Sequence, residues 1–459
     1  MDTATHRALA DIVGKQNVSE RIMDLVSYTY DASSYEHRPD CAMWAETTAQ
    51  VSRILSLANE KGIPVTVRGA GTSLGGLSVP ARGGIVLDLS RMNTIVEISI
   101  PDRLAVVQPG VVYADFQTAL APHGFFFPPD PASGVVCTLG GNVATNAGGL
   151  HAVKYGTTRD YVLRMEAVLA AGEVMRVGAR TMKTSSGYDL CRFLVGSEGT
   201  LAVITEITFK IAPKASHRAT AMAVFPKLED AGEAVTKVMH SEVTPSVLEL
   251  LDGSVIALLR KHAQVELPDV EALLLVETDG MTEEYVRFQL ERVADMFRCC
   301  KAAEVKVAAT EKEAEGLWKA RKSIGGMMGA LRRDYIPEDI TVPMSQIAAF
   351  LRGSEELSRV HGLDLINFGH AGDGNLHTNV IFDGTDPGQM TRLEALLYDL
   401  HKLACDLGGT LSGEHGIGMT KAKYMPLEHD QTALKTMRVL KKALDPNNIL
   451  NPGKMMLPG

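Results

Sequence analysis

The chain has 459 residues, of which 45% are hydrophobic and 22% charged, and its formal net charge is −9. This length and hydrophobic share allow a large core and about two or three domains, whereas the acidic balance gives no electrostatic support to nucleic-acid binding. The six cysteines form no Cys-x-x-Cys pair, so they argue against an iron–sulfur cluster and are typical of reduced cytosolic thiols.

The N-terminal part is predicted to begin with a helical lead-in over residues 1–34. Its first residues lack the basic start and the apolar core of a signal peptide, and apolar runs fall short of the roughly 18–20 residues that span a membrane. We therefore expect a cytoplasmic protein without a transmembrane segment, either free or held at the inner membrane face by a partner. A second helix is predicted from a capping box at Thr47 and Gln50 and from apolar residues at helical spacing: Val51, Ile54, Leu55 and Ala58.

A glycine-rich stretch follows that helix at residues 64–76. Glycines let the backbone approach phosphate oxygens and point N–H groups at them. The stretch does not fit a Rossmann fingerprint, because its spacing is Gly-x-Gly-x3-Gly and because a strand at residues 84–89 follows it in place of a helix. A pyrophosphate loop between two strands suits a flavin dinucleotide in a non-Rossmann domain. The alternative is a glycine-rich connection without a ligand.

Later stretches repeat this chemistry. Residues 128–131 read Pro-Pro-Asp-Pro and lead into residues 138–149, which hold small side chains, amides and hydroxyls but few large apolar residues. Such a run suits a backbone packed against a planar, polar cofactor. Residues 196–210 begin with Gly-Ser-Glu-Gly and then alternate as a strand does.

The C-terminal half is predicted to open at a boundary marked by Pro213-Lys214. Helices over residues 229–240 and 282–297 alternate there with strands such as residues 272–277. A last helix is expected around residues 432–444, because the Asp-Pro that follows it cannot continue a helix.

Two strands are also predicted at residues 365–368 and 378–382, on either side of His370-Ala-Gly-Asp-Gly-Asn-Leu-His377. Gly-Asp-Gly is turn chemistry, and a hairpin closed there brings the two histidines towards each other. With Glu414, in a Gly-Glu-His-Gly loop, they would form a three-ligand site with open positions, which is typical of a catalytic metal. The alternative is a pair of surface histidines beside a turn, with Glu414 an unrelated loop acid.

Together, the glycine-rich loops resemble the FAD-binding domain of the vanillyl-alcohol oxidase, or PCMH-type, flavoprotein superfamily. With the two histidine motifs, the chain is similar to the D-2-hydroxy-acid dehydrogenase branch, which includes D-lactate dehydrogenases, the flavin subunit of glycolate oxidase and D-2-hydroxyglutarate dehydrogenase. The likeness runs from about residue 35 to Lys454. It implies an α+β fold, in which a PCMH-type FAD-binding domain is joined to a substrate cap on an antiparallel sheet with helices on one face.

The resemblance also implies which residues bind FAD. They lie in the loops described above and in the C-terminal tail: Arg68, Gly69, Ala70, Gly71, Thr72, Ser73, Pro128, Asp130, Thr138, Gly140, Gly141, Asn142, Ala144, Thr145, Gly148, Gly149, Glu198, Val203, Ile204 and Asn451. Lys454 is implied to border the same pocket. Relatives with covalent flavin carry the bond on a histidine or cysteine of these loops, where this chain has Thr72-Ser73, so we expect non-covalent FAD. If a bond did form, His123, His151 and Cys137 would be the candidates.

The implied reaction is oxidation of a small D-2-hydroxy acid, with proton abstraction and hydride transfer to flavin N5. A divalent ion (Zn²⁺, or Fe²⁺ or Mn²⁺) at His370, His377 and Glu414 would orient the acid and lower the pKa of its hydroxyl. His415 is assigned as the base, with a fourth metal ligand as the alternative. Asn379 lies on the same strand face as His377 and is assigned as a donor to the substrate.

Two further residues carry the implied substrate preference. Arg321 matches the arginine that holds the substrate carboxylate in its guanidinium fork, the alternative being a solvated charge on a helix. Members that act on longer diacids tend to have a lysine where this chain has Pro337, which cannot pair with a second carboxylate. The sequence therefore favours D-lactate first and glycolate second over D-2-hydroxyglutarate.

The predicted organisation has four parts. They are a helical lead-in (1–34), a PCMH-type FAD-binding domain (35–213), a substrate cap domain with the metal site (214–420) and a C-terminal segment that returns to the FAD domain (421–459).

Electrons are expected to leave to a partner, because the chain has neither a cluster motif nor a second dinucleotide loop. An electron-transferring flavoprotein or an iron–sulfur subunit is expected first, and a quinone or cytochrome next; a homodimer stays open. Two other classes of protein remain as alternatives: a flavin-free metallohydrolase, and a non-catalytic flavoprotein subunit that only relays electrons.

Overall fold

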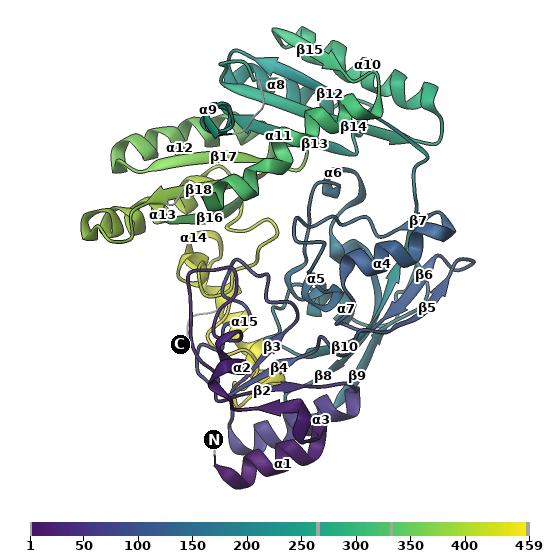
Figure 1. Cartoon of the computed structure of the whole chain (residues 1–459), viewed down its shortest axis with the longest axis vertical. Coiled ribbons are helices and arrows are strands. Elements are labelled where there is room, and N and C mark those ends of the chain that lie inside the picture. Colours follow the sequence, from purple (N-terminus) through teal and green to yellow (C-terminus); the bar gives the residue numbers. More distant parts are fainter. Residues whose placement is uncertain (1, 263–266, 331–333, 456–459) are drawn as a thin grey trace. The chain divides into compact units, whose positions relative to one another are not determined.

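The computed structural model of the chain describes residues 2–262, 267–330 and 334–455 (Figure 1). The chain packs as two compact units. Unit 1 comprises Met1–Gly148, Gly156–Lys214 and Glu414–Gly459, and unit 2 comprises Gly149–Tyr155 and Ala215–Gly413. In the described ranges, no helix combines the length and the apolar character that crossing a membrane requires.

The first sheet of unit 1 has four strands in the order β1-β2-β4-β3. Their bounds are β1 Val18–Ser19, β2 Cys41–Trp44, β3 Val65–Arg68 and β4 Ile85–Asp88. β4 pairs in parallel with both β2 and β3. The predicted glycine-rich stretch is therefore the connection from β3 to its parallel neighbour β4, and it makes this crossover without a helix.

The second sheet of unit 1 is antiparallel, with five strands in the order β5-β6-β10-β8-β9. Their bounds are β5 Ile95–Ser99, β6 Leu104–Val107, β8 Val162–Val168, β9 Val174–Gly178 and β10 Val203–Lys210, and a separate pair joins β7 Phe125–Phe126 to β11 Ala212–Pro213. The strand predicted in residues 196–210 is thus confirmed as β10. It is central and buried on both faces for most of its length, so its burial does not alternate as its sequence does.

Helices complete unit 1. They are α1 Thr3–Val13, α2 Ile22–Val26, α3 Thr48–Lys61, α4 Tyr113–Leu120, α5 Leu139–Thr145, α7 Leu190–Leu194, α14 Met425–Glu428 and α15 Gln431–Leu444, with 3-10 turns η1 Lys15–Asn17, η2 Ala121–His123, η3 Thr158–Asp160 and η5 Ala422–Tyr424. The capping box predicted for α3 is present, and its apolar stripe joins a core that also contains Leu9 and Leu450. The N-terminal helix and the C-terminal tail are therefore both part of this core.

Unit 2 is built on one antiparallel sheet of seven strands in the order β15-β12-β14-β13-β17-β18-β16. Their bounds are β12 His217–Phe225, β13 Val247–Asp252, β14 Ala272–Gly280, β15 Glu304–Val307, β16 Asp334–Thr341, β17 Asp364–His370 and β18 Asn375–Phe382. The helices of the unit are α6 Ala152–Tyr155, α8 Leu228–Met239, α9 Gly253–His262, α10 Glu283–Cys299, α11 Glu311–Ala330, α12 Ile347–His361 and α13 Pro387–Asp406, with the 3-10 turn η4 Met344–Gln346. The helices and the strand predicted in this half are thus confirmed as α8, α10 and β14.

Helices cover both faces of this sheet, so the expectation of helices on one face is wrong. On one face lie α8, α10, α12 and α13; Phe297 of α10, for example, packs on Phe225. On the other face, α9 and Ile324 of α11 pack over Leu251 and Phe368. Strand residues of both parities are apolar here, so each face needs its own cover.

The hairpin predicted around the two histidines is confirmed. β17 and β18 pair antiparallel, with His370 opposite Asn375 and Phe368 opposite His377. Gly374 closes the turn at φ +81°, a left-handed conformation that favours glycine. Both histidines therefore lie on the face of the sheet that α9 and α11 cover.

Candidate active site

A cavity with about 1320 Å³ of empty space, its open mouth included, lies in unit 1. Its lining includes most of the residues predicted to bind FAD: Arg68, Gly69, Ala70, Gly71, Thr72, Ser73, Thr138, Gly140, Gly141, Asn142, Ala144, Thr145, Glu198, Val203, Ile204 and Asn451. Stretches far apart in the sequence thus converge on one space. Because most of these residues are small, much of the wall is backbone.

Two glycines show how closely these loops approach. A Cβ added to Gly69 would lie 2.2 Å from Thr138 Oγ1. A Cβ on Gly71, at φ +70°, would meet the guanidinium of Arg68. Thr138 also caps α5 by accepting from the N–H of Gly141 at 3.3 Å. The first turn of α5 and the glycine-rich loop therefore form one tight wall that offers backbone N–H groups, which suits a dinucleotide.

Some predicted FAD residues have a different position. Pro128, Asp130 and Gly148 are not among the residues that line the cavity, and Gly149 belongs to unit 2. Arg68 lines it, but its guanidinium donates to Tyr30 O at 2.8 Å and to Ser27 O at 3.1 Å. Arg68 therefore anchors the N-terminal segment.

Sequence reasoning missed other residues of the wall. Pro109, Ala132 and Leu77 line the cavity without belonging to any glycine-rich motif. For Leu77 and Ala132, the one available signal was their position beside the motifs. Pro109 is recognisable only in the fold, where a Cβ on Gly140 would lie 2.5 Å from its Cβ.

Glu198 is a buried carboxylate in the wall of this cavity. Its two oxygens accept from the backbone N–H groups of Ile417 at 2.6 Å and Gly418 at 2.9 Å. Burial raises the pKa of Glu198 to about 7, against the opposite effect of these donors and of Lys454 and Lys421. The predicted cofactor residue thus also anchors the chain two and three residues after His415.

The C-terminal tail is part of the same wall. Asn451, in a left-handed conformation, donates from Nδ2 to Leu77 O and to Glu198 O. Lys454 does not line the cavity; it is buried and donates to Val79 O. The tail thereby joins the wall beside β3, because Leu450 forms a parallel bridge with Val65 and the N–H of Asn451 donates to Val65 O at 2.7 Å.

Glu414 and His415 also line the cavity of unit 1. Glu414 Oε1 is 4.0 Å from His415 Nε2, and a Cβ on Gly148 would lie 3.1 Å from Glu414 Oε2. The adjacent carboxylate and imidazole predicted for metal binding and base catalysis therefore face the space predicted for the flavin.

Unit 2 carries the remaining predicted chemistry on one sheet face. The rings of His370 and His377 are 5.2 Å apart and nearly perpendicular. His370 Nδ1 is 2.5 Å from Glu249 Oε1, and Arg321 Nε donates to Glu249 Oε2 at 2.6 Å. The guanidinium of Arg321 lies 4.7 Å above the ring of Phe368. Arg321 is therefore not the solvated helix charge of the alternative reading.

Glu249 lies at the centre of this group and is fully buried. Burial by itself would raise its pKa, but the charges and hydrogen bonds of His370 and Arg321 outweigh burial and hold the pKa of Glu249 below its usual range. Sequence reasoning missed Glu249, because β13 reads as an ordinary buried strand with one glutamate.

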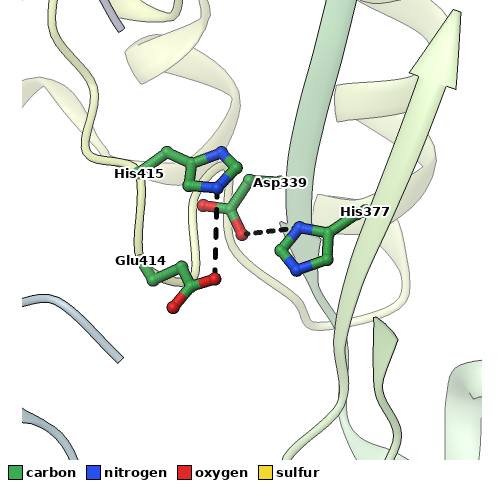
Figure 2. A group of neighbouring side chains, drawn as sticks. All are labelled: Asp339, His377, Glu414 and His415. Carbon is green, nitrogen blue, oxygen red and sulfur yellow. Dashed lines mark ion pairs between the residues drawn. The ribbon is translucent and has the colours of Figure 1, made fainter. Parts of the chain in front are cut away.

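A second buried carboxylate, Asp339, was also missed. It lies opposite His377 in the β16–β18 register, 3.9 Å from His377 Nδ1, and accepts from Asn375 Nδ2 at 2.6 Å and from Ser412 Oγ at 2.8 Å. Figure 2 shows this pair and the Glu414–His415 pair of unit 1. Two imidazoles, each with a carboxylate beside Nδ1, are a donor set that suits a divalent transition metal.

Asn379 and Pro337 lie opposite each other in the same register. Both therefore share the sheet face of His377 and Asp339, as predicted for Asn379. The amide of Asn379 is buried, and its Nδ2 donates to Ile366 O at 3.3 Å.

Two family models match the chain. The FAD binding domain model matches residues 39–178, and the model for the C-terminal domain of FAD linked oxidases matches residues 214–455. The second match covers more than half of the chain.

Relatives match along nearly the whole length. Glycolate oxidase subunit GlcD of Bacillus subtilis is 38% identical over 97% of this chain and 95% of its own. D-lactate dehydrogenases of Archaeoglobus fulgidus and Anaerostipes hadrus are 40% and 35% identical, over 89% and 91% of this chain and 89% and 90% of their own.

Solved structures show the same fold. A p-cresol methylhydroxylase structure with bound substrate aligns with a TM-score of 0.80 at 19% identity, over 98% of this chain and 96% of that one. The 4-ethylphenol oxidase of Gulosibacter chungangensis aligns with a TM-score of 0.77 at 18% identity, over 99% and 96%. The chain therefore belongs to the FAD-linked oxidase family, as an oxidoreductase of α+β fold with a PCMH-type FAD-binding domain.

Proposed function

We propose that the chain oxidises a small D-2-hydroxy acid, with D-lactate as the best substrate and pyruvate as its product. The observation that carries this proposal is the arrangement in unit 2, where Arg321 and His370 share one buried carboxylate on one sheet face. In a 2-hydroxy acid the carboxylate and the hydroxyl lie on neighbouring carbons. Binding it therefore requires a cation for the carboxylate and, next to it, an imidazole that can hold a metal for the hydroxyl.

The residues have distinct roles in this proposal. Bound FAD supplies the hydride acceptor, and a bound divalent ion, with Zn²⁺ as our first choice, supplies a Lewis acid for the substrate hydroxyl. Arg321 holds the substrate carboxylate, Asn379 donates to the substrate, and His415 takes the hydroxyl proton on a ring nitrogen.

The metal would be held by His370, His377 and Glu414. The two histidines come from one hairpin. Glu414 follows Gly413, whose N–H donates to Asp339 O at 3.3 Å. The carboxylate of Glu414 would complete a set of imidazole and carboxylate ligands that suits a divalent ion.

FAD is proposed to bind without a covalent bond. Among the three alternative attachment residues, Cys137 lines the cavity, whereas the exposed His123 does not. Burial raises the pKa of the Cys137 thiol, which disfavours the reactive thiolate. Acid precipitation should release the yellow colour into the supernatant, and colour kept in the pellet would contradict this part of the proposal.

Small acids are favoured over diacids because of Pro337. It faces the same side as Asn379 and His377, where a basic side chain could otherwise meet a second carboxylate. A distal carboxylate buried there without a partner would cost several kcal/mol relative to lactate. Glycolate is the second candidate, supported by the relative named as a glycolate oxidase subunit.

Electrons are proposed to leave to a partner and not to NAD. That relative is named as a subunit, and a relative from Arabidopsis thaliana is named a cytochrome D-lactate dehydrogenase. A cytoplasmic electron-transferring flavoprotein or an iron–sulfur subunit fits this proposal, with a quinone or cytochrome next.

The test is anaerobic bleaching of the flavin with D-lactate, L-lactate, glycolate and D-2-hydroxyglutarate. We expect D-lactate to bleach fastest at limiting concentration. A higher second-order rate for D-2-hydroxyglutarate or L-lactate would overturn the substrate assignment. No bleaching by any of them would favour a relay subunit, and a protein purified without flavin would favour a metallohydrolase.

A further inference from the structure

Glu249 is a carboxylate that none of the roles above uses. It lies within β13, in the interior of the seven-stranded sheet, and its side chain is fully buried. Burying a carboxylate is costly unless it is paired and hydrogen-bonded. Its position in the middle of a strand of leucines and valine therefore needs an explanation.

The two oxygens of Glu249 have different partners. Oε1 faces His370 Nδ1 at 2.5 Å, and Oε2 accepts from Arg321 Nε at 2.6 Å. These partners come from β17 and α11, which are far from β13 in the sequence. One carboxylate thus contacts the group assigned to the metal and the group assigned to the substrate carboxylate.

Each contact fixes one property of its partner. A neutral imidazole that donates from Nδ1 to a carboxylate carries its lone pair on Nε2, which is the atom that can then ligate a metal. A guanidinium that donates from Nε to Oε2 and lies 4.7 Å above Phe368 is restricted to one plane. The remaining N–H groups of its fork then have a fixed direction.

We propose that Glu249 is a shared positioning residue, which sets the ligating nitrogen of His370 and the orientation of the Arg321 fork together. The proposal rests on the proposed function for the roles of His370 and Arg321. It adds that the two halves of the substrate site are coupled through one side chain. A change at Glu249 should therefore affect metal binding and substrate binding in the same protein.

The simpler alternative is that Glu249 only stabilises the core. A core role predicts lower stability but unchanged affinities in the folded fraction. Glu277 provides a matched control. It is a buried glutamate on the adjacent strand β14, lies opposite Val247 and so faces the same side as Glu249, and contacts Ser246 in place of a site residue.

The experiment compares Glu249→Gln with Glu277→Gln in the FAD-loaded protein. Zn²⁺ affinity is measured by competition with a chromophoric chelator, and KM and kcat are measured with D-lactate. We expect Glu249→Gln to weaken Zn²⁺ binding by about 10–100-fold and to raise KM by roughly 10-fold. Glu277→Gln should change neither by more than about twofold. Equal effects of the two substitutions would overturn the proposal.

Two backgrounds separate the two contacts. In His370→Ala, Glu249→Gln should no longer affect Zn²⁺ affinity; in Arg321→Ala, it should no longer affect KM. Undiminished effects in both backgrounds would overturn the coupling. If His370→Ala itself leaves Zn²⁺ affinity unchanged, the metal assignment of the proposed function fails, which differs from a result in which His370→Ala acts and Glu249→Gln does not.

A folding failure of Glu249→Gln would not end the test. The double variant Glu249→Gln/Arg321→Met removes both charges, so no unpaired cation remains buried. Compared with Arg321→Met alone, it should still show the loss of Zn²⁺ affinity. Equal Zn²⁺ affinity in those two variants would overturn the role of Glu249 towards His370.

Discussion

The cavity of unit 1 and the charged cluster of unit 2 are built in opposite ways. The cavity wall is mostly glycine, alanine, serine and threonine from a few continuous stretches. Its segments approach each other most closely where a glycine has no side chain, as Gly69 does beside Thr138. The charged cluster consists of Glu249, His370 and Arg321. These large ionisable side chains each come from a different strand or helix, and buried Glu249 contacts the other two.

The difference reflects what each region has to recognise. A dinucleotide is long and rich in phosphate and ring edges, so backbone N–H groups along a loop can bind it. A small acid offers few atoms, and charges held at fixed distances must recognise them. The cavity should therefore be sensitive to added volume, and the cluster to the removal of a charge or a ligand.

The largest effect is expected from metal removal. Chelation followed by desalting should lower turnover of D-lactate by about 10³-fold or more, because the Lewis acid supplies several kcal/mol. The flavin absorbance should stay, since the glycine-rich loops that line the cavity contain none of the proposed metal ligands. Added Zn²⁺ should restore activity, and full turnover in protein shown to be metal-free by elemental analysis would refute the assignment.

The second largest effect is expected from removing Arg321, the cation proposed to bind the substrate carboxylate. Arg321→Ala should lower kcat/KM for D-lactate by about 100-fold, through a higher KM and a lower kcat, because a charge-assisted pair is lost. Steady-state kinetics with an artificial dye as acceptor measures this. Lys319→Ala, an exposed lysine on the same helix, is the control, and a similar loss there would count against a specific role for Arg321.

Added volume in the cavity should weaken FAD binding and leave metal binding unchanged. Gly69→Ala places a Cβ 2.2 Å from Thr138 Oγ1, and overpacking of this kind costs about 1–3 kcal/mol. FAD affinity, measured by titration of the apoprotein, should fall by roughly 10–100-fold, while Zn²⁺ affinity should stay the same. Gly316→Ala, where the Cβ meets open space, should retain FAD; unchanged FAD affinity in Gly69→Ala would separate the loop from the flavin.

The smallest effect concerns pH and Glu198. Its pKa is raised to about 7 in the fold, so the folded protein holds a proton that the unfolded chain releases above about pH 4.5. The contribution of Glu198 to the free energy of unfolding is therefore largest at low pH and is lost as the pH rises through 7. Between pH 5 and 7 the wild type should lose about 2 kcal/mol relative to Glu198→Gln.

Urea unfolding at pH 5, 6 and 7 measures that difference. The range ends at pH 7 because the pKa of Lys454 is lowered to about 8, so this lysine stays protonated below it. Parallel stability curves for the wild type and Glu198→Gln would show that Glu198 does not titrate in this range.

Much of the fold could be read from local patterns. The capping box of α3, the turn between β17 and β18 and the end of α15 at Asp445 all depend on neighbouring residues, and the structure confirms them. Local patterns did not reveal the second helical layer of unit 2. The cover over Leu251 and Phe368 comes from α9 and α11, and nothing in the sequence of a buried strand says which face a distant helix will cover.

The sequence by itself determined the kinds of chemistry present: each glycine-rich stretch, the paired histidines and the Glu-His loop lie within about a dozen consecutive residues. Only the tertiary structure decided which distant carboxylates contact and position these groups. Glu249 is 121 residues from His370 and 72 from Arg321, and Glu198 is more than two hundred residues from the loop that it anchors. Partners of this kind are selected by packing and by the need to neutralise a buried charge. Neither requirement leaves a pattern in the residues next to them.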